Sequence, residues 1–377
     1  MKHIFFWSPH IDPQVATVKS VINSLNSLSK YQKHLKLTLI NVFGEWNNFN
    51  HNKIAVEDLL ESKRLLKEKF KGFLNSRILY IKIFFFSYLP LKKILKKKKP
   101  EFLIIHLLTS MPLILFSINN FQTKLILRIS GLPKLNIFRY YLWKLASRKI
   151  KFVICPTQET KNFLLKKKIF DSEKIIYVPD PIIEIKKINI LKNKKIDNHF
   201  DKPYFLCIGR LTKQKNHIFL LNFFQKNLTY LKKFKLVIIG QGELLEKYKK
   251  IIYSEKLNNF IHILDYKKNV INYIKNAKCL ISCSLWEDPG FVMIEAASVG
   301  TPIITSDCPN GPKEFINDNE CGFIFSSNNE KSFKKALDSF LDSSKEDIKV
   351  KLFNAKKKSR KYTLFYNASK IYNMISD

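Results

Sequence analysis

Short apolar runs recur along this chain, and segments long enough for a helix separate them. In the first half the runs are KHIFFW (2–7), LKLTLINVFG (35–44), FLIIHL (102–107), KLILRIS (124–130) and KFVICP (151–156). Neighbouring parallel strands need a crossover connection of about a dozen residues or more between them, usually a helix. The alternation therefore predicts an α/β fold with a parallel, doubly wound sheet.

A second series of apolar runs follows a polar, lysine-rich segment at 185–203. These runs are YFLCIGRL (204–211), KLVIIG (235–240), FIHIL (260–264), KCLISCS (278–284) and TPIITSD (301–307). With 377 residues, the chain is long enough for two domains. We predict two Rossmann-like domains that face a cleft, one over 1–190 and one over 200–360, with 185–203 as the linker. Parallel sheets bind ligands at the carboxyl ends of their strands, so we expect the site in this cleft.

The formal net charge of the chain is +35. Abundant Lys, Ile, Asn and Phe with few Gly fit an AT-rich genome, while an anionic partner is the alternative explanation. Between Lys69 and Gln158, eighteen Lys and Arg stand against one acidic residue, Glu101. Within this stretch, 73–99 interleaves bulky apolar residues with bases. That pattern suits an anionic membrane surface, or a buried helix or strand followed by a solvated lysine run.

Several classes of protein are disfavoured by what the sequence lacks. The six cysteines form no CxxC motif and most of them sit in apolar runs, which indicates reduced, packed thiols and no metal site. No signal peptide is apparent, and the best transmembrane candidate, 102–118, carries His106 and Pro112 in its middle. We expect a strand, a turn and a helix there. No nucleic-acid-binding module is recognisable, so we predict no nucleic-acid partner.

The stretch EDPGFVMIE (287–295) places two glutamates around a Pro-Gly pair. We predict a turn at Pro289 and Gly290 and then a helix over 291–299, with Gly300 as its stop. Glu287 would then lie in the loop and Glu295 on the helix. The backbone N–H groups at the helix start would form an anion site, whereas an ordinary turn with two surface glutamates is the alternative.

Two further loops follow predicted strands of the second half. GRLTKQKN (209–216) carries Arg210 and Lys215, two cations suited to phosphate oxygens. A basic loop in a very basic protein is the plainer interpretation. In LVIIGQGEL (236–244), Gly240 and Gly242 allow a close turn after a strand, although GxG alone is a weak signal.

Taken together and in order, four motifs carry a resemblance to a known family. They are GRLTKQKN, LVIIGQGE, EDPGFVMIE and EAASVGTPIITSDCPNGPKEFI. They resemble the retaining nucleotide-sugar glycosyltransferases of the GT-B fold, the glycosyltransferase family 4-like enzymes called glycosyl transferases group 1. The resemblance is strongest over about 200–325 and weaker, in the same order, before it. It implies an acceptor-binding N-terminal domain, a nucleotide-sugar-binding C-terminal domain and a C-terminal helix, 361–377, that crosses back onto the N-terminal domain.

The resemblance also implies an activity. A sugar, of hexosyl type, would move from a nucleotide diphosphate sugar to a hydroxyl of a glycan or lipid-linked acceptor, with retention and without metal or other cofactor. Bacterial surface polysaccharide or lipopolysaccharide synthesis would be the setting, and the enzyme would be cytoplasmic and peripheral on the inner face of the membrane. The alternatives are a basic nucleic-acid- or membrane-surface-binding protein without transferase activity, and a GT-B epimerase-like relative.

The candidate site residues fall into three groups. The resemblance implies that the donor is bound by Arg210, Lys215, Gly290, Phe291, Val292 and Glu295, and that Glu287 contacts the donor sugar as a catalytic residue. His106 is a second catalytic candidate because it ends a strand-like run, although a lone His in an apolar run is usually a core residue. Acceptor-side candidates are His10, Asp12 and Ser130.

Overall fold

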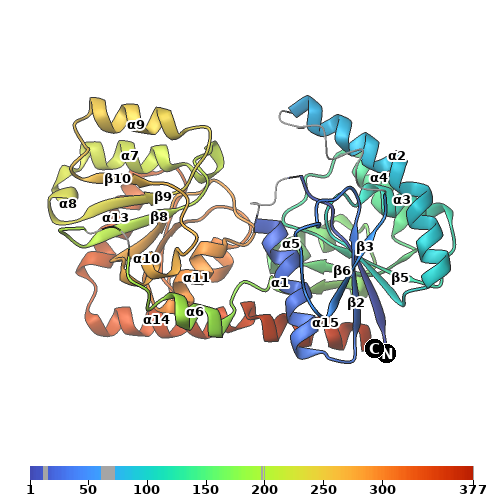
Figure 1. The fold of residues 1–377 in the computed structure, drawn as a ribbon. Coiled ribbons are helices and arrows are strands. Elements are labelled where there is room, and N and C mark those ends of the chain that lie inside the picture. Colours follow the sequence, from blue (N-terminus) through green and yellow to red (C-terminus); the bar gives the residue numbers. More distant parts are fainter. Residues whose placement is uncertain (12–15, 61–72, 197, 199, 377) are drawn as a thin grey trace. The chain divides into compact units, whose positions relative to one another are not determined.

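The computed structural model describes residues 1–11, 16–60, 73–196, 198 and 200–376 (Figure 1). The chain forms two compact units. The first is Met1–Pro181 together with Leu364–Asp377, and the second is Ile182–Thr363. Each unit is built on its own parallel sheet with helices between the strands, so the predicted pair of Rossmann-like domains is confirmed.

The first unit holds a sheet of seven strands in the described part of the chain. All strand pairs are parallel, in the order β3-β2-β1-β4-β5-β6-β7. The strands are β1 (His3–Trp7), β2 (Lys36–Asn41), β3 (Ile54–Asp58), β4 (Phe102–Ile105), β5 (Lys124–Arg128), β6 (Ile150–Cys155) and β7 (Ile175–Tyr177). The inner strands are buried on both sides, which explains their continuous apolar sequences.

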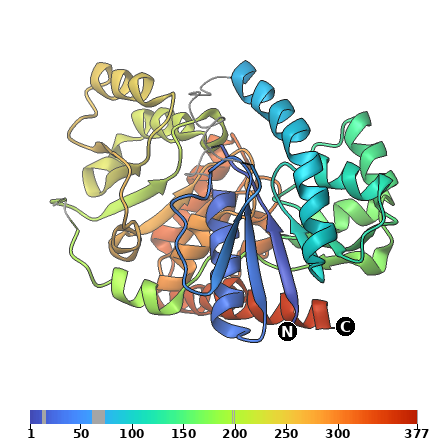
Figure 2. The ribbon, with the colours of Figure 1, turned by 45° about the vertical axis from the view of Figure 1, so that its right-hand side comes forward.

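Helices cover both faces of the first sheet. One face carries α2 (Phe73–Lys98), α3 (Ser110–Ile118), α4 (Ile137–Ala146) and α5 (Gln158–Lys167), and a short helix, η1 (Ser172–Lys174), precedes β7. The other face carries α1 (Ala16–Tyr31) and α15 (Leu364–Ser376). Figures 1 and 2 show α15 beside α1, and the two helices are in contact.

Helix α15 is fixed to the first unit by apolar and polar contacts. Ile371 and Met374 are buried in the same core cluster as residues of α1 and of the sheet. Ser24 Oγ of α1 donates a hydrogen bond to Asn367 Oδ1 at 3.1 Å, and Asn367 Nδ2 donates to the Pro179 carbonyl at 3.0 Å. The side-chain oxygen and nitrogen of buried Asn367 therefore both have hydrogen-bond partners, which fixes the position of α15 on the first unit.

The second unit holds a sheet of six parallel strands among the residues described. Their order is β10-β9-β8-β11-β12-β13. The strands are β8 (Tyr204–Ile208), β9 (Lys235–Ile239), β10 (Ile261–Leu264), β11 (Cys279–Ser282), β12 (Ile303–Ser306) and β13 (Phe323–Phe325).

Helices again form two layers. One face of the second sheet carries α7 (His217–Lys226), α8 (Leu228–Lys233), α9 (Leu245–Ser254) and α13 (Glu330–Asp342). The opposite face carries α6 (Ile185–Leu191), α10 (Ile271–Asn276), α11 (Phe291–Val299), α12 (Pro312–Ile316) and α14 (Lys345–Ser359). Two short helices, η2 (Lys213–Lys215) and η3 (Arg360–Tyr362), lie in the connections.

The segment predicted as a linker needs correction. Residues 185–191 form α6, and Ile188 is buried in the core of the second unit. Residues 182–190, which the sequence assigned to the first domain, therefore belong to the second unit. Within this lysine-rich stretch Ile188 is buried and Leu191 packs against the same core, while Lys186 and Lys187 are exposed.

The stretch 102–118 forms a strand, a turn and a helix, as predicted. It comprises β4 and α3, and Pro112 lies in the first turn of α3, where its missing N–H leaves no intrahelical bond unmade. Within the residues searched, no helix has the length and apolar content needed to cross a membrane.

Candidate functional site

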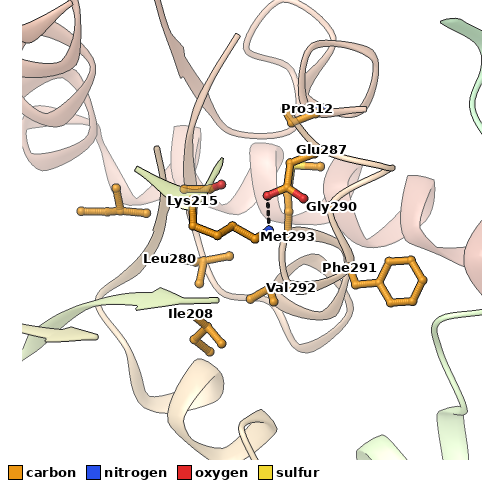
Figure 3. Close-up of a pocket in the computed structure, with 11 residues that line it drawn as sticks. Ile208, Lys215, Leu280, Glu287, Gly290, Phe291, Val292, Met293 and Pro312 are labelled. Carbon is orange, nitrogen blue, oxygen red and sulfur yellow. Dashed lines mark hydrogen bonds and ion pairs between the residues drawn. The ribbon is translucent and has the colours of Figure 1, made fainter. Parts of the chain in front are cut away.

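A pocket opens at the carboxyl edge of the sheet in the second unit (Figure 3). Residues at the ends of β8 and β11, the loop after β8 and the start of α11 surround it. Its walls are Ile208, Lys215, Leu280, Ile281, Ser282, Glu287, Gly290, Phe291, Val292, Met293 and Pro312. Five of the predicted donor-side residues, counting Glu287, are therefore brought together in one pocket.

An ion pair lies in this pocket. Lys215 Nζ is 2.5 Å from Glu287 Oε1, and Figure 3 shows the lysine chain reaching across to the carboxylate. Ser284 Oγ donates a second hydrogen bond, of 2.6 Å, to the same oxygen. The Glu287 side chain is about one tenth exposed and that of Lys215 about one fifth. A carboxylate this buried needs such partners, because removal from water disfavours its charged form.

The loop that carries Lys215 is tied to the loop that carries Glu287. The backbone carbonyl of Gln214 accepts a hydrogen bond from the Leu285 N–H at 2.9 Å, and its side chain donates one from Nε2 to the Trp286 carbonyl at 3.0 Å. Behind the lysine, the Cys283 thiol donates to the Lys215 carbonyl. Gly209 leaves room for the lysine stem, since a Cβ there would come within 3.1 Å of its carbons. Lys215 therefore has little freedom to leave the pocket.

The helix α11 begins at the pocket wall. Gly290 precedes it with φ of 96°, a left-handed conformation that favours glycine. The first intrahelical bond runs from Ile294 N–H to the Gly290 carbonyl, so the N–H groups of the first turn have no acceptor inside the helix. Together with the helix dipole they favour an anion. The Phe291 ring points away from the ion pair in Figure 3, so this residue offers its backbone rather than its ring.

Glycines allow the loops around the pocket to meet. A Cβ on Gly240 would lie 1.9 Å from the Gly209 carbonyl oxygen, and one on Gly242 would lie 2.4 Å from that of Leu211. The glycines of the close turn predicted after β9 therefore allow the loop after β9 to lie against the backbone of the loop after β8. Gly311 lies against the turn that joins Glu287 to α11. A Cβ added at this position would be 2.3 Å from the Pro289 carbonyl oxygen.

Gly311→Ala should disturb the pocket through this contact. The added methyl group meets backbone rather than a movable side chain, and φ at this position is 136°. We expect a loss of about 2–4 kcal/mol in the free energy of unfolding of the second unit, measured by urea denaturation. Gly300→Ala is the matched control: its φ is 76° but nothing lies within 4 Å, so about 1 kcal/mol should be lost. Equal losses in the two variants would contradict the steric role of Gly311.

Two predicted donor residues do not line the pocket. Arg210 is exposed, and its guanidinium lies 3.4 Å from Gln214 Oε1. Glu295 lies one turn into α11 and is 6% exposed. The sequence reasoning also missed Ser284 and Pro312. Ser284 is the second residue beyond β11, and its position at a strand's carboxyl end was the available signal.

The first unit brings two other predicted residues together. Ser130 Oγ lies 3.1 Å from His106 Nε2, just beyond the carboxyl ends of β5 and β4. His10, beyond β1, is buried with its ring edge-on to Trp46 at a centroid distance of 4.4 Å. Because β1, β4 and β5 are neighbours in the sheet, all three residues lie at one edge of it. Asp12 lies outside the described residues.

The His106 imidazole is held neutral. Burial, with the nearby charge of Arg128, lowers the pKa of His106 well below its usual value. Its Nδ1 is buried and has no hydrogen-bond partner. A neutral imidazole with one nitrogen engaged by Ser130 can donate or accept a proton in a hydrogen bond, but it carries no charge at neutral pH.

A buried ion pair lies close by in the first unit. Arg128 donates from Nη2 to Asp180 Oδ1 at 2.5 Å and to Ser20 Oγ at 2.6 Å. The two charged side chains are 4% and 7% exposed. The pair joins the end of β5 to α1 and to the chain segment directly before the second unit begins.

The described residues contain no group of three or more His, Cys, Asp or Glu side chains that could hold a metal ion. All six cysteines are buried free thiols.

Comparison with known structures gives the fold a name. The chain superposes on a glycosyltransferase from Rickettsia africae with a TM-score of 0.74 and 18% identity, over 99% of this chain and 97% of that one. The fold is GT-B. GT-B is thus the arrangement of two parallel-sheet units that the sequence motifs predicted, and at this identity the likeness concerns the fold alone.

The match to a known sequence family lies in the second unit. Residues 189–359 match the family described as Glycosyl transferases group 1. The chain is 32% identical over 250 residues to an uncharacterised glycosyltransferase of Methanocaldococcus jannaschii, over 59% of this chain. It is 28% identical over 157 residues, 42% of this chain, to the Campylobacter jejuni N-acetylgalactosamine-N,N'-diacetylbacillosaminyl-diphospho-undecaprenol 4-alpha-N-acetylgalactosaminyltransferase. The chain spans 60% and 41% of the lengths of these two relatives.

Proposed function

We propose that this protein transfers a sugar from a nucleotide diphosphate sugar to a hydroxyl of a glycan or lipid-linked acceptor, with retention of anomeric configuration. The observation that carries this proposal is the pocket of the second unit. It joins a cation, a buried carboxylate and a helix start at the carboxyl edge of a parallel sheet. A diphosphate next to a sugar requires these features: positive groups for the phosphates and an acceptor for hydroxyls.

The residues predicted to bind the donor then have the following roles. The donor diphosphate lies against Lys215 and the backbone N–H groups of Gly290, Phe291 and Val292. Glu287, held by Ser284, accepts hydrogen bonds from hydroxyls of the donor sugar. Arg210, in the same loop as Lys215, adds a second cation on the phosphate side. Glu295, within α11, accepts from the ribose hydroxyls.

The reaction depends on stabilising the leaving group. The bond between the anomeric carbon and the phosphate oxygen breaks, and its electron pair leaves with the nucleoside diphosphate. The acceptor oxygen bonds to the same face of the anomeric carbon, and its proton passes to the departing phosphate oxygen. Fixed positive charge from Lys215 and the α11 start lowers the energy of this developing anion. The proposed reaction uses no metal or other cofactor.

The first unit supplies the acceptor side. His106 is a neutral hydrogen-bonding group, oriented by Ser130, and we assign it a catalytic contact with the acceptor hydroxyl. His10 and Asp12 complete the acceptor side. A lipid-linked acceptor is suggested by the diphospho-undecaprenol in the name of the Campylobacter jejuni relative. The setting that follows is bacterial surface polysaccharide or lipopolysaccharide synthesis, with the enzyme cytoplasmic and peripheral on the inner face of the membrane.

A panel of UDP-, GDP- and ADP-sugars tests donor binding by thermal shift. A donor at a hundredfold excess over its Kd stabilises by about 2.7 kcal/mol, which raises the Tm of a unit of this size by about 5–10 °C. We expect one nucleotide to do so, and EDTA to change neither the shift nor the turnover. Absence of any shift across the panel would refute the proposed donor site. Loss of turnover with EDTA, restored by a divalent metal, would refute metal independence.

Product analysis separates transfer from related chemistry. Proton NMR of the product should show the anomeric configuration of the donor. An epimerase-like relative would instead convert the nucleotide sugar without any acceptor, and a binding protein would leave it unchanged.

A further inference from the structure

Two helices of the first unit expose apolar side chains on the side turned away from the sheet. Helix α2 buries Leu79 and Ile83 toward the sheet, yet its other side carries Phe85, Phe86 and Leu89 in solvent. Helix α4 likewise buries one side and exposes Ile137, Tyr141 and Leu145 on the other. We call these six exposed residues and their two helices the α2–α4 surface.

The α2–α4 surface is not a scatter of single exposed residues, which every protein surface contains. Phe85 and Leu89 are four residues apart, as are Ile137, Tyr141 and Leu145, so on each helix they form one stripe. Phe85, Leu89 and Ile137 are 72%, 70% and 79% exposed. A helix that is apolar on two opposite sides is expected where both sides meet an apolar environment.

The two stripes face the same way. Helix α2 packs on α3 and α3 packs on α4, and all three bury their inner sides in one core cluster. Both Figures 1 and 2 show the three helices together on one side of the first sheet. The outer sides of α2 and α4 therefore belong to one face of this unit.

The charge of this face has one sign. Neither α2 nor α4 contains an Asp or Glu. Exposed bases stand next to the stripes, namely Lys93, Lys96 and Lys97 at the end of α2 and Arg139 and Lys144 within α4. An apolar stripe bordered by Lys and Arg is complementary to a lipid interface, where acyl chains lie beneath phosphate groups.

We propose that the α2–α4 surface docks on the surface of a bilayer that contains anionic lipid. The aromatic and aliphatic side chains enter the interface and the bases pair with lipid phosphates, so the protein lies on the membrane without crossing it. A second copy of this chain fits less well, because two surfaces of equal positive sign would meet. Single-stranded nucleic acid would use aromatic faces for stacking, and would leave Leu89, Ile137 and Leu145 without a partner.

This inference gives a specific surface to the peripheral location proposed above. It rests on exposed side chains and charge in the first unit, while the donor pocket lies in the second. A binding assay without sugar nucleotide therefore tests it separately from sugar transfer.

Vesicle co-sedimentation of the full chain tests the docking surface. Vesicles of phosphatidylcholine with phosphatidylglycerol should bind the protein, binding should weaken with salt, and pure phosphatidylcholine should bind little. The triple variant Lys93→Gln/Lys96→Gln/Lys97→Gln should weaken vesicle binding about a hundredfold, because each base near the membrane surface increases the affinity about fivefold. Phe85→Ser/Leu89→Ser should weaken it about tenfold or more, and all five residues are exposed enough for the fold to persist.

Helix α14 of the second unit supplies matched control variants. Val350→Ser/Phe353→Ser removes two apolar side chains that are 59% and 66% exposed, and Lys345→Gln/Lys356→Gln/Lys357→Gln removes three bases. Each should change binding less than threefold. An equal loss in control and α2 variants would overturn the proposal, as would equal binding to neutral vesicles. Tighter binding of a single-stranded oligonucleotide that depends on Phe85, or a dimer that the α2 variants dissociate, would also overturn it.

Discussion

Lys215→Ala is expected to lower kcat for sugar transfer by about a hundredfold to a thousandfold. Removal of one preorganised positive group that faces the developing charge of a leaving group has effects of this size. The lysine is positioned for that role by its ion pair with Glu287 and by the loop contacts of Gln214. Release of nucleoside diphosphate from the donor found in the thermal-shift panel is the measurement.

The same loop provides the control for this experiment. Lys213→Ala removes an equal charge from η2, but Lys213 is exposed and does not line the pocket, so kcat should change less than threefold. Fold integrity is checked by circular dichroism and by a single cooperative melting transition; the Tm itself is expected to fall, because Glu287 loses its counterion and keeps only the hydrogen bond from Ser284. If Lys215→Ala keeps kcat within threefold of the unaltered protein, the lysine has no catalytic role and the assignment of the pocket is wrong.

Asp180→Asn should destabilise the first unit by about 3–5 kcal/mol. The substitution leaves the charge of Arg128 buried without its counterion, and breaking a buried pair in this way has costs of that order. Urea unfolding followed by tryptophan fluorescence reports mainly on the first unit, which contains three of the four tryptophans, Trp7, Trp46 and Trp143, and Trp286→Phe removes the signal of the second unit.

Two further variants separate the buried pair from a general effect of charge. Glu57→Gln breaks the pair with Lys98, whose side chains are 27% and 38% exposed, and should change stability by no more than about 1 kcal/mol. The double variant Arg128→Met/Asp180→Leu should recover most of the loss, because an apolar pair avoids the desolvation of both charges. A loss in Asp180→Asn no larger than in Glu57→Gln would show that the buried pair contributes little.

The inner strands and the helix at the pocket were predictable because their signals are local. Apolar runs gave β4, β5, β8 and β9, and Gly300 marked the end of α11, where the structure shows φ of 76°. The strand β3 was missed. Its sequence IAVED is short and mostly exposed, because it lies at the edge of the sheet and has one neighbouring strand. The edge strand β13 has three residues and gives no periodic signal.

Contacts between distant segments were less predictable. Lys215 and Glu287 are 72 residues apart and meet because β8 and β11 are neighbours in the sheet, an order that local patterns do not specify. Only the family resemblance linked them in advance. Nothing in a chain with 66 Lys and Arg marks Arg128 as the one that pairs with Asp180.

The exposed apolar stripes show another limit of sequence patterns. The segment 73–99 was consistent with a buried helix or with a membrane surface, and the structure shows that α2 has one buried and one exposed apolar side. The sequence of α4, IFRYYLWKLA, did not predict an exposed apolar side. Its apolar residues lie on both sides of the helix, so the pattern does not show which side packs on the sheet.

The contact of α15 with α1 has a consequence for synthesis on the ribosome. The first unit needs residues 364–376 to cover the sheet face formed by Ile4, Phe6 and Ile104, whereas the second unit is complete at Thr363. Domains commonly fold in the order in which they are translated. Here the first unit is translated first but is expected to finish folding last, after α15 has been made. Its uncovered apolar sheet face must therefore be kept from aggregating while the whole second unit is synthesised.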